Sequence, residues 1–326
     1  MDENLRAAPG PDEAARSAVA ERARSVLRPA GALARLDDVA AWLAAWQRTE
    51  HPHVDRPAAL IFAGDHGVSS EGVSAYPADV TAAMLRALRE GVATANAMAR
   101  ALGATLDVID AGVGRPTGNI ARESAMDPAR FETCIRLGRD AVAARAGADL
   151  LVFGEMGIGN TTAAAGVVAT IFGGPAEQWT GRGTGVDDGT WRRKVEVVER
   201  ARARAGTVRP FDALREVGGC ELVAIAGAIA EARARSIPVV LDGFVVAAAA
   251  ATLEAASPGA LEHCIAGHRS PEPGHGLLLE KFGMDPLLDL GMRLGEGSGA
   301  LAAVPIVRLA AAVVTEVATF GEWGLG

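Results

Sequence analysis

Two glutamates stand in glycine-rich segments where a carboxylate could do chemistry. Glu155 lies in GEMGIGNTTAAAG (154–166), between an apolar run and an alanine-rich stretch. Glu296 lies in GMRLGEGSGAL (291–301), just before a long apolar stretch. A carboxylate at the start of a hydrophobic helix has surroundings of low dielectric constant, which raise its pKa and suit a general base for a weakly acidic N–H group. The structural alternative is a charge that caps the helix dipole.

The turn after the first of these glutamates has the composition of an anion site. Gly157 and Gly159 allow the backbone to come close to a ligand. The N–H groups exposed at the start of the next helix attract anions, and the residues that could cap that helix are Asn160, Thr161 and Thr162. The segment lacks the G-K-[ST] of a P-loop and the GxGxxG of a dinucleotide site. A ligand site and a plain strand-to-helix turn both stay open.

The loop GDHGVSSEGVSAYP (64–77) carries a second set of candidates. Asp65 and His66 follow an apolar run directly, which is a common place for catalytic residues, although an Asp-His pair alone is weak evidence. Tyr76 is the only tyrosine of the chain. Its ring could stack on a flat ligand or could anchor the loop.

Paired aspartates precede a charged helix in GRGTGVDDGTWRRK (181–194). Asp187 and Asp188 could bind a metal, but at a helix start an N-cap and a first-turn acid are the more frequent use of such residues. Lys194 would lie about two turns into this helix. From there its ammonium group could reach a phosphate or stay in solvent.

A proline-rich loop, AGHRSPEPGH (266–275), contains two histidines and a glutamate. His268, Glu272 and His275 are of types that bind metals, but nothing in the sequence places them on one face. Arg269 and Ser270 of the same loop suit the orientation of an acidic group instead.

Short apolar runs precede these loops, and this order predicts an α/β fold. Strands are expected at 59–63, 105–112 and 149–153, and within 236–244 and 262–270, with helices between them, including one from 78 to 102. Alternating strands and helices predict a mainly parallel, Rossmann-like sheet flanked by helices. In such sheets the ligand binds at the carboxyl ends of the strands, where the polar loops begin.

The terminal segments predict a small helical subdomain. Two helices are expected in 11–48, and a long apolar helix in 297–320 is expected to pack on them. We therefore divide the chain into an α/β catalytic core, 50–295, and a helical subdomain made of 1–49 and 296–326.

Composition narrows the classes of partner. The chain has 326 residues and a formal net charge of −8, which argues against a nucleic-acid partner. Its three cysteines are scattered, which predicts reduced thiols rather than disulfides or a zinc site. The acidic start does not resemble a signal peptide, and alanine-rich stretches such as 244–256 are too short to span a bilayer. We expect a cytoplasmic protein with no membrane partner.

Six motifs occur in order along the chain: FAGDHGVSSEGVSAYP, GEMGIGNTTAAAG, GRGTGVDD, LDGFVVAAAA, GHRSPEPGH and RLGEGSGA. Together they closely resemble the nicotinate-nucleotide–dimethylbenzimidazole phosphoribosyltransferases, over about residues 56–320. The resemblance implies transfer of the phosphoribosyl group of nicotinate mononucleotide to a benzimidazole-type base, with inversion at the anomeric carbon. The products are nicotinate and α-ribazole 5′-phosphate, in cobalamin synthesis. It also implies a homodimer that needs no metal or other cofactor.

The resemblance implies roles for single residues as well. Glu296 is the base that takes the N–H proton, Glu155 lies near the reaction centre, and Lys194 meets the phosphate. Met84 stands where some members carry a glutamine on the wall of the base pocket, which leaves other benzimidazoles, purines or a phenol open as acceptors. The remaining expected substrate-binding residues are Asp65, His66, Ser74, Tyr76, Gly157, Gly159, Asn160, Thr161, Thr162, Asp242, Gly243, Ser270 and Gly297.

Two other classes of protein stay as alternatives. A metal-dependent nucleotide or nucleoside hydrolase would use Asp65, His66, His268 and His275, and a chelator would inhibit it. A nucleotide-binding sensor would use the same glycine loops, and it would bind nicotinate mononucleotide without turnover when a benzimidazole is added.

Overall fold

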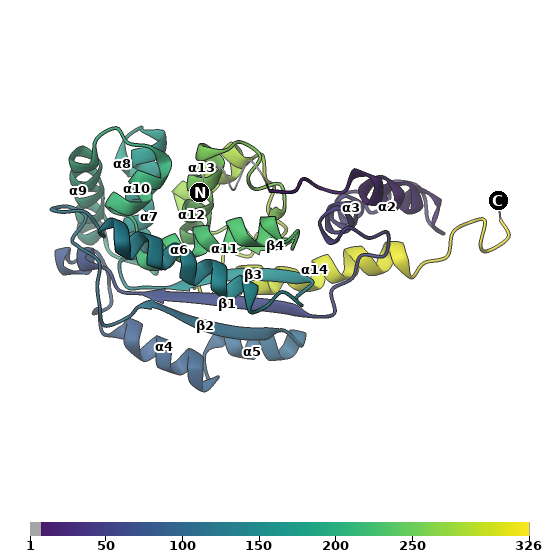
Figure 1. Ribbon diagram of the computed structural model, residues 1–326, viewed down its shortest axis with the longest axis horizontal. Coiled ribbons are helices and arrows are strands. Elements are labelled where there is room, and N and C mark those ends of the chain that lie inside the picture. Colours follow the sequence, from purple (N-terminus) through teal and green to yellow (C-terminus); the bar gives the residue numbers. More distant parts are fainter. Residues whose placement is uncertain (1–7, 326) are drawn as a thin grey trace.

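The computed structural model describes residues 8–325 and contains a five-stranded sheet (Figure 1). The strands are β1 (Pro57–Gly64), β2 (Thr105–Gly112), β3 (Leu150–Met156), β4 (Val239–Leu241) and β5 (Cys264–Ala266), in the spatial order β2-β1-β3-β4-β5. Each pairing between neighbours is parallel, which confirms the predicted α/β sheet. Residues 1–7 and 326, which the sequence analysis assigned to the helical subdomain, lie outside the described residues.

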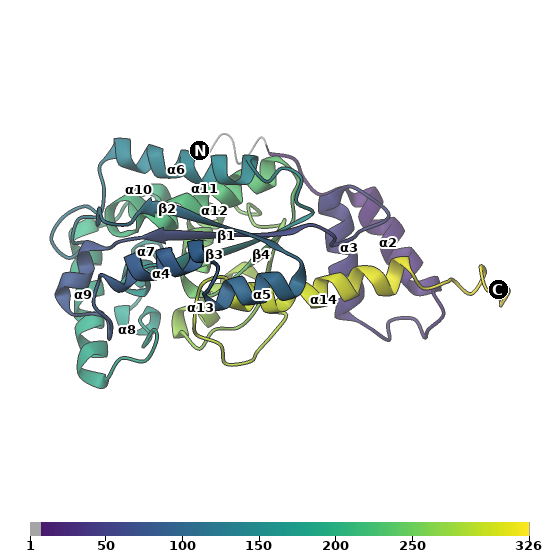
Figure 2. The same cartoon turned by 90° about the horizontal axis from the view of Figure 1, so that it is seen from below.

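Alternate residues of the central strand enter two hydrophobic cores, one on each face of the sheet. Leu60 and Phe62 of β1 pack into one core and Ala59 and Ile61 into the other, because successive side chains of a strand point to opposite faces. The first face is covered by α6 (Pro128–Ala143), α7 (Asn160–Phe172), α10 (Pro210–Val217), α11 (Cys220–Ala234) and α12 (Phe244–Ala256). The second is covered by α4 (Val80–Glu90), α5 (Thr94–Leu102) and α14 (Ser298–Thr315) (Figures 1 and 2).

Shorter elements and the charged helix surround the carboxyl ends of the strands. They are the 3-10 helix η1 (Gly67–Glu71), α8 (Ala176–Trp179), α9 (Asp188–Ala205) and α13 (Pro273–Phe282). Asp187 caps α9 by accepting a hydrogen bond from the N–H of Thr190, as the capping interpretation of the aspartate pair predicts.

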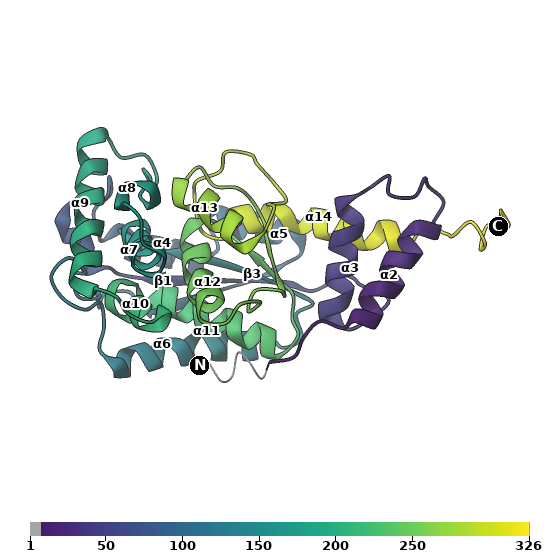
Figure 3. The ribbon, with the colours of Figure 1, turned by 90° about the horizontal axis from the view of Figure 1, so that it is seen from above.

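The two N-terminal helices, α2 (Glu13–Ser25) and α3 (Arg35–Gln47), lie against α14 at one end of the molecule (Figure 3). The predicted contact between the terminal segments is therefore confirmed. Helix α14 also contacts β3, β4 and α5. One hydrophobic core thus joins the terminal helices to the sheet, and the division of the chain at residues 49 and 296 stays a prediction.

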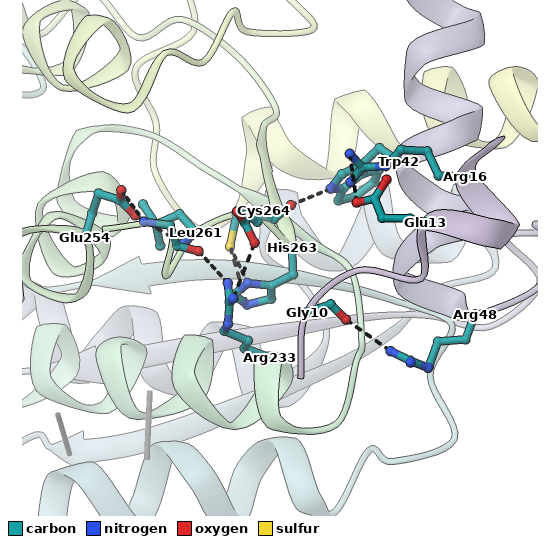
Figure 4. A network of polar contacts seen from close by, with 12 residues as sticks. Gly10, Glu13, Arg16, Trp42, Arg48, Arg233, Glu254, Leu261, His263 and Cys264 are labelled. Atoms are coloured by element: carbon teal, nitrogen blue, oxygen red, sulfur yellow. Dashed lines mark hydrogen bonds and ion pairs between the residues drawn. The ribbon is translucent and has the colours of Figure 1, made fainter. Parts of the chain in front are cut away.

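A polar junction attaches α3 to the segment that enters β5 (Figure 4). The indole N–H of Trp42 donates to the carbonyl of Glu262 at 3.1 Å. The guanidinium of Arg233 lies over the ring of Trp46, which meets the His263 ring edge to face. Burial, with a smaller effect of Arg233, lowers the pKa of His263 to about 3, so this histidine is neutral and structural.

Helix α14 has 18 residues and a mean hydropathy of 1.8, so by length and composition it could cross a membrane. More than half of it, 56%, is buried inside the protein. Its contacts with the sheet, α3 and α5 are those of a core helix, and core helices often have this composition.

The prediction of one continuous helix from 78 to 102 is wrong, because α4 and α5 are separate helices. Gly91 ends α4 with a φ of +79°, a left-handed conformation that terminates helices and favours glycine. The turn matters for the site, since α4 and the start of α5 line different parts of the pocket described next.

Candidate active site

A cavity of about 410 Å³ opens at the carboxyl edge of the sheet, where the strand-end loops meet. Its size is typical of a site for a small molecule. Most of the expected site residues line it: Ser74, Tyr76, Met84, Glu155, Gly157, Gly159, Asn160, Thr161, Lys194, Asp242, Gly243, Ser270 and Glu296. Its wall also contains residues outside the expected set, among them Thr94, Arg182, Phe244, His268, Glu272 and Arg293.

Glu155 stands at the end of β3, inside this cavity. Its carboxylate accepts a hydrogen bond from the side-chain amide of Asn160. Removal from water, followed by the negative charges of Asp242 and Glu221, raises the pKa of Glu155 to about 8. The carboxylate therefore exchanges its proton near neutral pH, and a positive charge beside it would favour the ionised form.

Glu296 faces the same cavity from the turn that begins α14. Its backbone has a φ of +59°, in the left-handed region that a glutamate rarely adopts, and its N–H donates to the carbonyl of Glu155 at 3.1 Å. A Cβ atom on Gly154 would lie 2.2 Å from the backbone nitrogen of Gly297, so this close approach requires glycine. The two carboxylates are thus held together through the main chain.

The side chain of Glu296 has the environment that the sequence predicts for a general base. It is 3% exposed, and its Oε2 has no hydrogen-bond partner within residues 8–325. Burial raises the pKa of this carboxyl, with a smaller contribution from Asp242, while the amide of Ala95 partly opposes the rise. Strained backbone and an unpaired buried oxygen are features that concentrate at functional sites.

The start of α7 differs from the predicted capping arrangement. Gly159 occupies the cap position, and no side chain caps the helix. Asn160 and Thr161 instead direct their side chains to Glu155 and Lys194. Within 157–162, the amides of Ile158, Asn160 and Thr162 already donate to other groups. In the part of the chain that the structure describes, the N–H groups of Gly157, Gly159 and Thr161 are the ones left open for an anion.

Lys194 reaches this helix start from α9. The side chain is 2% exposed, and its Nζ lies 3.0 Å from the hydroxyl of Thr161. Burial lowers the pKa of Lys194, and the carboxylate of Glu272 partly offsets the effect. A buried ammonium group next to open amides is suited to a phosphate, since an anion there would restore its charge balance.

A second row of polar side chains, Asp242, His268, Ser270, Glu272 and His275, follows the ends of β4 and β5. Asp242 accepts a hydrogen bond from the N–H of Ala300 at 3.0 Å, and His268 Nε2 lies 3.5 Å from the same oxygen. His275 Nδ1 accepts the N–H of Ser270. Glu272 accepts the N–H of Gly183 at 2.7 Å. The hydrogen bond to Ser270 makes His275 a support for the loop, whereas Oε2 of Glu272 is buried without a hydrogen-bond partner in the part of the chain that the structure describes.

One wall of the cavity is apolar and comes from the 73–84 segment. Val73, Val80 and Met84 line it together with Tyr76, whose side chain is 52% exposed at the mouth. The hydroxyl of Ser74 accepts the N–H of Tyr76 at 3.1 Å and fixes the turn that presents the ring. A flat aromatic ligand would fit between such groups.

Four expected residues do not line the cavity. Asp65 accepts the N–H of Gly114, and His66 is buried behind the glycine turn against Glu221. Thr162 is buried within α7, and Gly297 packs under the Glu296 turn against Ile61. All four lie in segments that adjoin lining residues, but the sequence cannot show that the side chains of Asp65, His66 and Thr162 point away from the cavity.

The four residues of the metal-dependent alternative do not form a group with metal-ligand spacing within residues 8–325. Asp65 and His66 have the partners just named, while His268 and His275 belong to the second row. Within residues 8–325, the group with metal-ligand geometry is His53, Asp55 and Asp149, which precede β1 and β3 at the opposite edge of the sheet.

Comparisons with known proteins agree with one another. A family model described as phosphoribosyltransferase matches residues 8–325. A nicotinate-nucleotide–dimethylbenzimidazole phosphoribosyltransferase of Mesorhizobium japonicum is 49% identical, covering 100% of this chain and 98% of its own. The enzyme of the same name from Novosphingobium aromaticivorans is 50% identical, and the match covers 97% of this chain and 94% of the relative. The crystal structure of CobT from Thermus thermophilus superimposes with a TM-score of 0.91 at 42% identity, covering 96% of this chain and 99% of its own.

Proposed function

The chain belongs to the nicotinate-nucleotide–dimethylbenzimidazole phosphoribosyltransferases, and from that premise we propose how the groups of its cavity divide the work. The enzyme transfers the phosphoribosyl group of nicotinate mononucleotide to 5,6-dimethylbenzimidazole or a related base. It yields nicotinate and α-ribazole 5′-phosphate, in cobalamin biosynthesis. The observation that carries our assignment of roles is the pairing of Glu155 and Glu296, two carboxyls with raised pKa values in one cavity.

The phosphate of the nucleotide binds between Lys194 and the start of α7. The ammonium group and the hydroxyl of Thr161 are already in contact, and the amides of Gly159 and Thr161 supply further donors. Lys194 is desolvated before the ligand arrives, so the phosphate meets a cation that little water screens.

The ribose lies between the phosphate site and the two carboxylates. Nicotinate leaves as the bond from the anomeric carbon to its ring nitrogen breaks, and the electron pair of that bond neutralises the pyridinium. Positive charge then develops on the sugar. Glu155 ionises in the presence of the cationic pyridinium and stabilises this charge, at a place where a lysine would oppose it.

The acceptor base enters along the apolar wall formed by Tyr76, Val80 and Met84. One ring nitrogen attacks the anomeric carbon from the face opposite to nicotinate, which inverts that centre. The proton on the other ring nitrogen passes to Glu296, whose raised pKa suits a weakly acidic N–H donor. Met84 offers no hydrogen bond at this wall, so we propose 5,6-dimethylbenzimidazole as the preferred acceptor.

We also propose that the enzyme acts as a homodimer in the cytoplasm, without a metal or other cofactor. The three cysteines are buried and free, which suits a reducing compartment. None of the steps above requires an electron acceptor or a Lewis acid, because Lys194 and the helix amides carry the phosphate.

A product assay tests the function. The protein is incubated with nicotinate mononucleotide and a panel of bases, and released nicotinate and the new nucleotide are separated and quantified. We expect both products in equal amounts, with dimethylbenzimidazole ahead of adenine and phenol. Release of ribose 5-phosphate instead would mean a hydrolase, and tight nucleotide binding without products would mean a sensor.

A further inference from the structure

A histidine and a glutamate form a buried pair directly behind the catalytic turn. His66 Nε2 lies 2.6 Å from Glu221 Oε1, and neither side chain is exposed. His66 follows β1, whereas Glu221 lies in the first turn of α11, whose amides favour a negative charge. Neither residue lines the cavity, so neither touches substrate in the roles proposed above.

The pair is in close contact with the backbone of the turn that carries the site. A Cβ atom on Gly157 would lie 3.2 Å from His66 Nε2, and one on Gly219 would lie 2.3 Å from His66 Cε1. The imidazole therefore fills the space between the 157–159 turn and the start of α11. A smaller side chain at position 66 would leave a cavity beneath Gly157, and a larger one would displace the turn.

Charge connects the pair to the reacting groups as well. Burial has the largest effect and lowers the pKa of His66, but the charge and hydrogen bond of Glu221, together with Cys220 and Asp65, outweigh it and raise the pKa above its ordinary value. Glu221 in turn raises the pKa of Glu155, next to the effects of burial, Asp242 and Glu296. The imidazolium thus compensates a carboxylate that acts on Glu155 from behind.

We propose that His66 and Glu221 are positioning residues, which hold the 157–159 turn under the phosphoribosyl group and balance the charge behind Glu155. The proposal rests on the function assigned above. A positioning role can be distinguished from mere packing, because substitution of His66 and substitution of Glu221 shift the pKa of Glu155 in opposite directions. Glu221→Gln removes the carboxylate that raises the pKa of Glu155 and leaves a neutral His66, so Glu155 becomes easier to ionise. His66→Gln leaves the Glu221 carboxylate uncompensated and makes Glu155 harder to ionise.

The test follows the affinity for nicotinate mononucleotide against pH by calorimetry, in the full-length protein and in these two variants. Ionised Glu155 favours the cationic pyridinium, so affinity rises with pH. We expect the midpoint of this rise to move down by about half a pH unit in Glu221→Gln and up by a similar amount in His66→Gln. The control is Glu231→Gln, at the far end of α11 in contact with Arg139 and Arg235, and its midpoint stays in place.

A second measurement covers the case in which His66→Gln does not fold. The imidazole signal of His66 is followed by NMR in the parent and in Glu221→Gln. We expect titration above the ordinary value of 6.5 in the parent and below it in the variant, where burial acts alone. Equal losses of affinity with unmoved midpoints, or a neutral His66 in the parent, would overturn the proposal. Binding is measured without turnover, so absence of products in the assay above would refute only the proposed function.

Discussion

The backbone N–H of Glu296 donates to the carbonyl oxygen of Glu155 at 3.1 Å. This single bond ties the turn before α14 to the end of β3, two segments far apart in the sequence. It places both carboxylates in one cavity, where one can face the sugar and the other the incoming base.

Replacement of Glu296 by glutamine removes the proposed proton acceptor and keeps the size of the side chain. We predict that kcat falls about 10²–10⁴-fold, the usual contribution of a general base, while the affinity for nicotinate mononucleotide changes little. Steady-state kinetics and calorimetry measure the two effects. Glu132→Gln, on the exposed face of α6, is the matched control. Turnover at the parent rate would show that another group accepts the proton.

Replacement of Lys194 by methionine keeps the packing and removes the cation of the proposed phosphate site. A hydrogen bond to a charged group contributes about 1.5–3 kcal/mol, so we predict a rise of about 10–150-fold in KM for nicotinate mononucleotide. The thermal midpoint stays the same or rises, because a buried cation no longer has to be desolvated. Arg192→Met, exposed on the same helix, leaves KM unchanged, and an unchanged KM in the lysine variant would place the phosphate elsewhere.

The raised pKa of Glu155 makes stability depend on pH. A carboxyl with a folded-state pKa of about 8 against 4.5 ordinarily binds its proton more tightly in the folded state. Its contribution to stability is therefore complete below pH 4.5 and is lost as the pH rises through 8. We predict that in Glu155→Gln the free energy of unfolding, measured with urea, decreases less as the pH rises. At pH 8 the variant is more stable than the parent by about 1–3 kcal/mol, while its turnover drops. A parallel pH dependence in parent and variant would exclude this pKa.

A methyl group on Gly154 tests the contact between β3 and the Glu296 turn. The added Cβ would lie 2.2 Å from the nitrogen of Gly297, so the turn must move. We predict that Gly154→Ala costs about 1–3 kcal/mol of stability and lowers kcat more than it weakens nucleotide binding. Gly147→Ala is the control, since its Cβ would meet no atom closer than 3.8 Å. Parent-like kcat would mean that the position of Glu296 tolerates displacement.

A substitution at Met84 tests which base the enzyme prefers as acceptor. A glutamine there would put an unpaired amide against the apolar edge of dimethylbenzimidazole, at a cost of about 1–3 kcal/mol, and could pair with the ring nitrogens of a purine. We predict that the ratio of kcat/KM for dimethylbenzimidazole over adenine falls about tenfold in Met84→Gln, with KM for the nucleotide unchanged. Competition assays measure the ratio, and a constant ratio would remove Met84 from the acceptor wall.

The order of strands and helices could be predicted because each apolar run is followed by a polar loop. The break at Gly91 was missed, since an isolated glycine within a helical pattern is tolerated as often as it ends the helix. The roles of Asn160 and Thr161 were mistaken for capping, because the same side chains suit a helix start and a ligand site. His66 was expected in the cavity. Its position after β1 is visible in the sequence, but its direction depends on Glu221, 155 residues away.

The most direct test of the roles given to Glu296 and Lys194 is a crystal structure with α-ribazole 5′-phosphate and nicotinate bound. We predict a carboxylate oxygen of Glu296 within about 2.6–3.2 Å of a ring nitrogen of the base, with the phosphate on Lys194 and the Thr161 amide. A complex in which Glu296 points away from both ligands, and another group meets that nitrogen, would contradict the assignment.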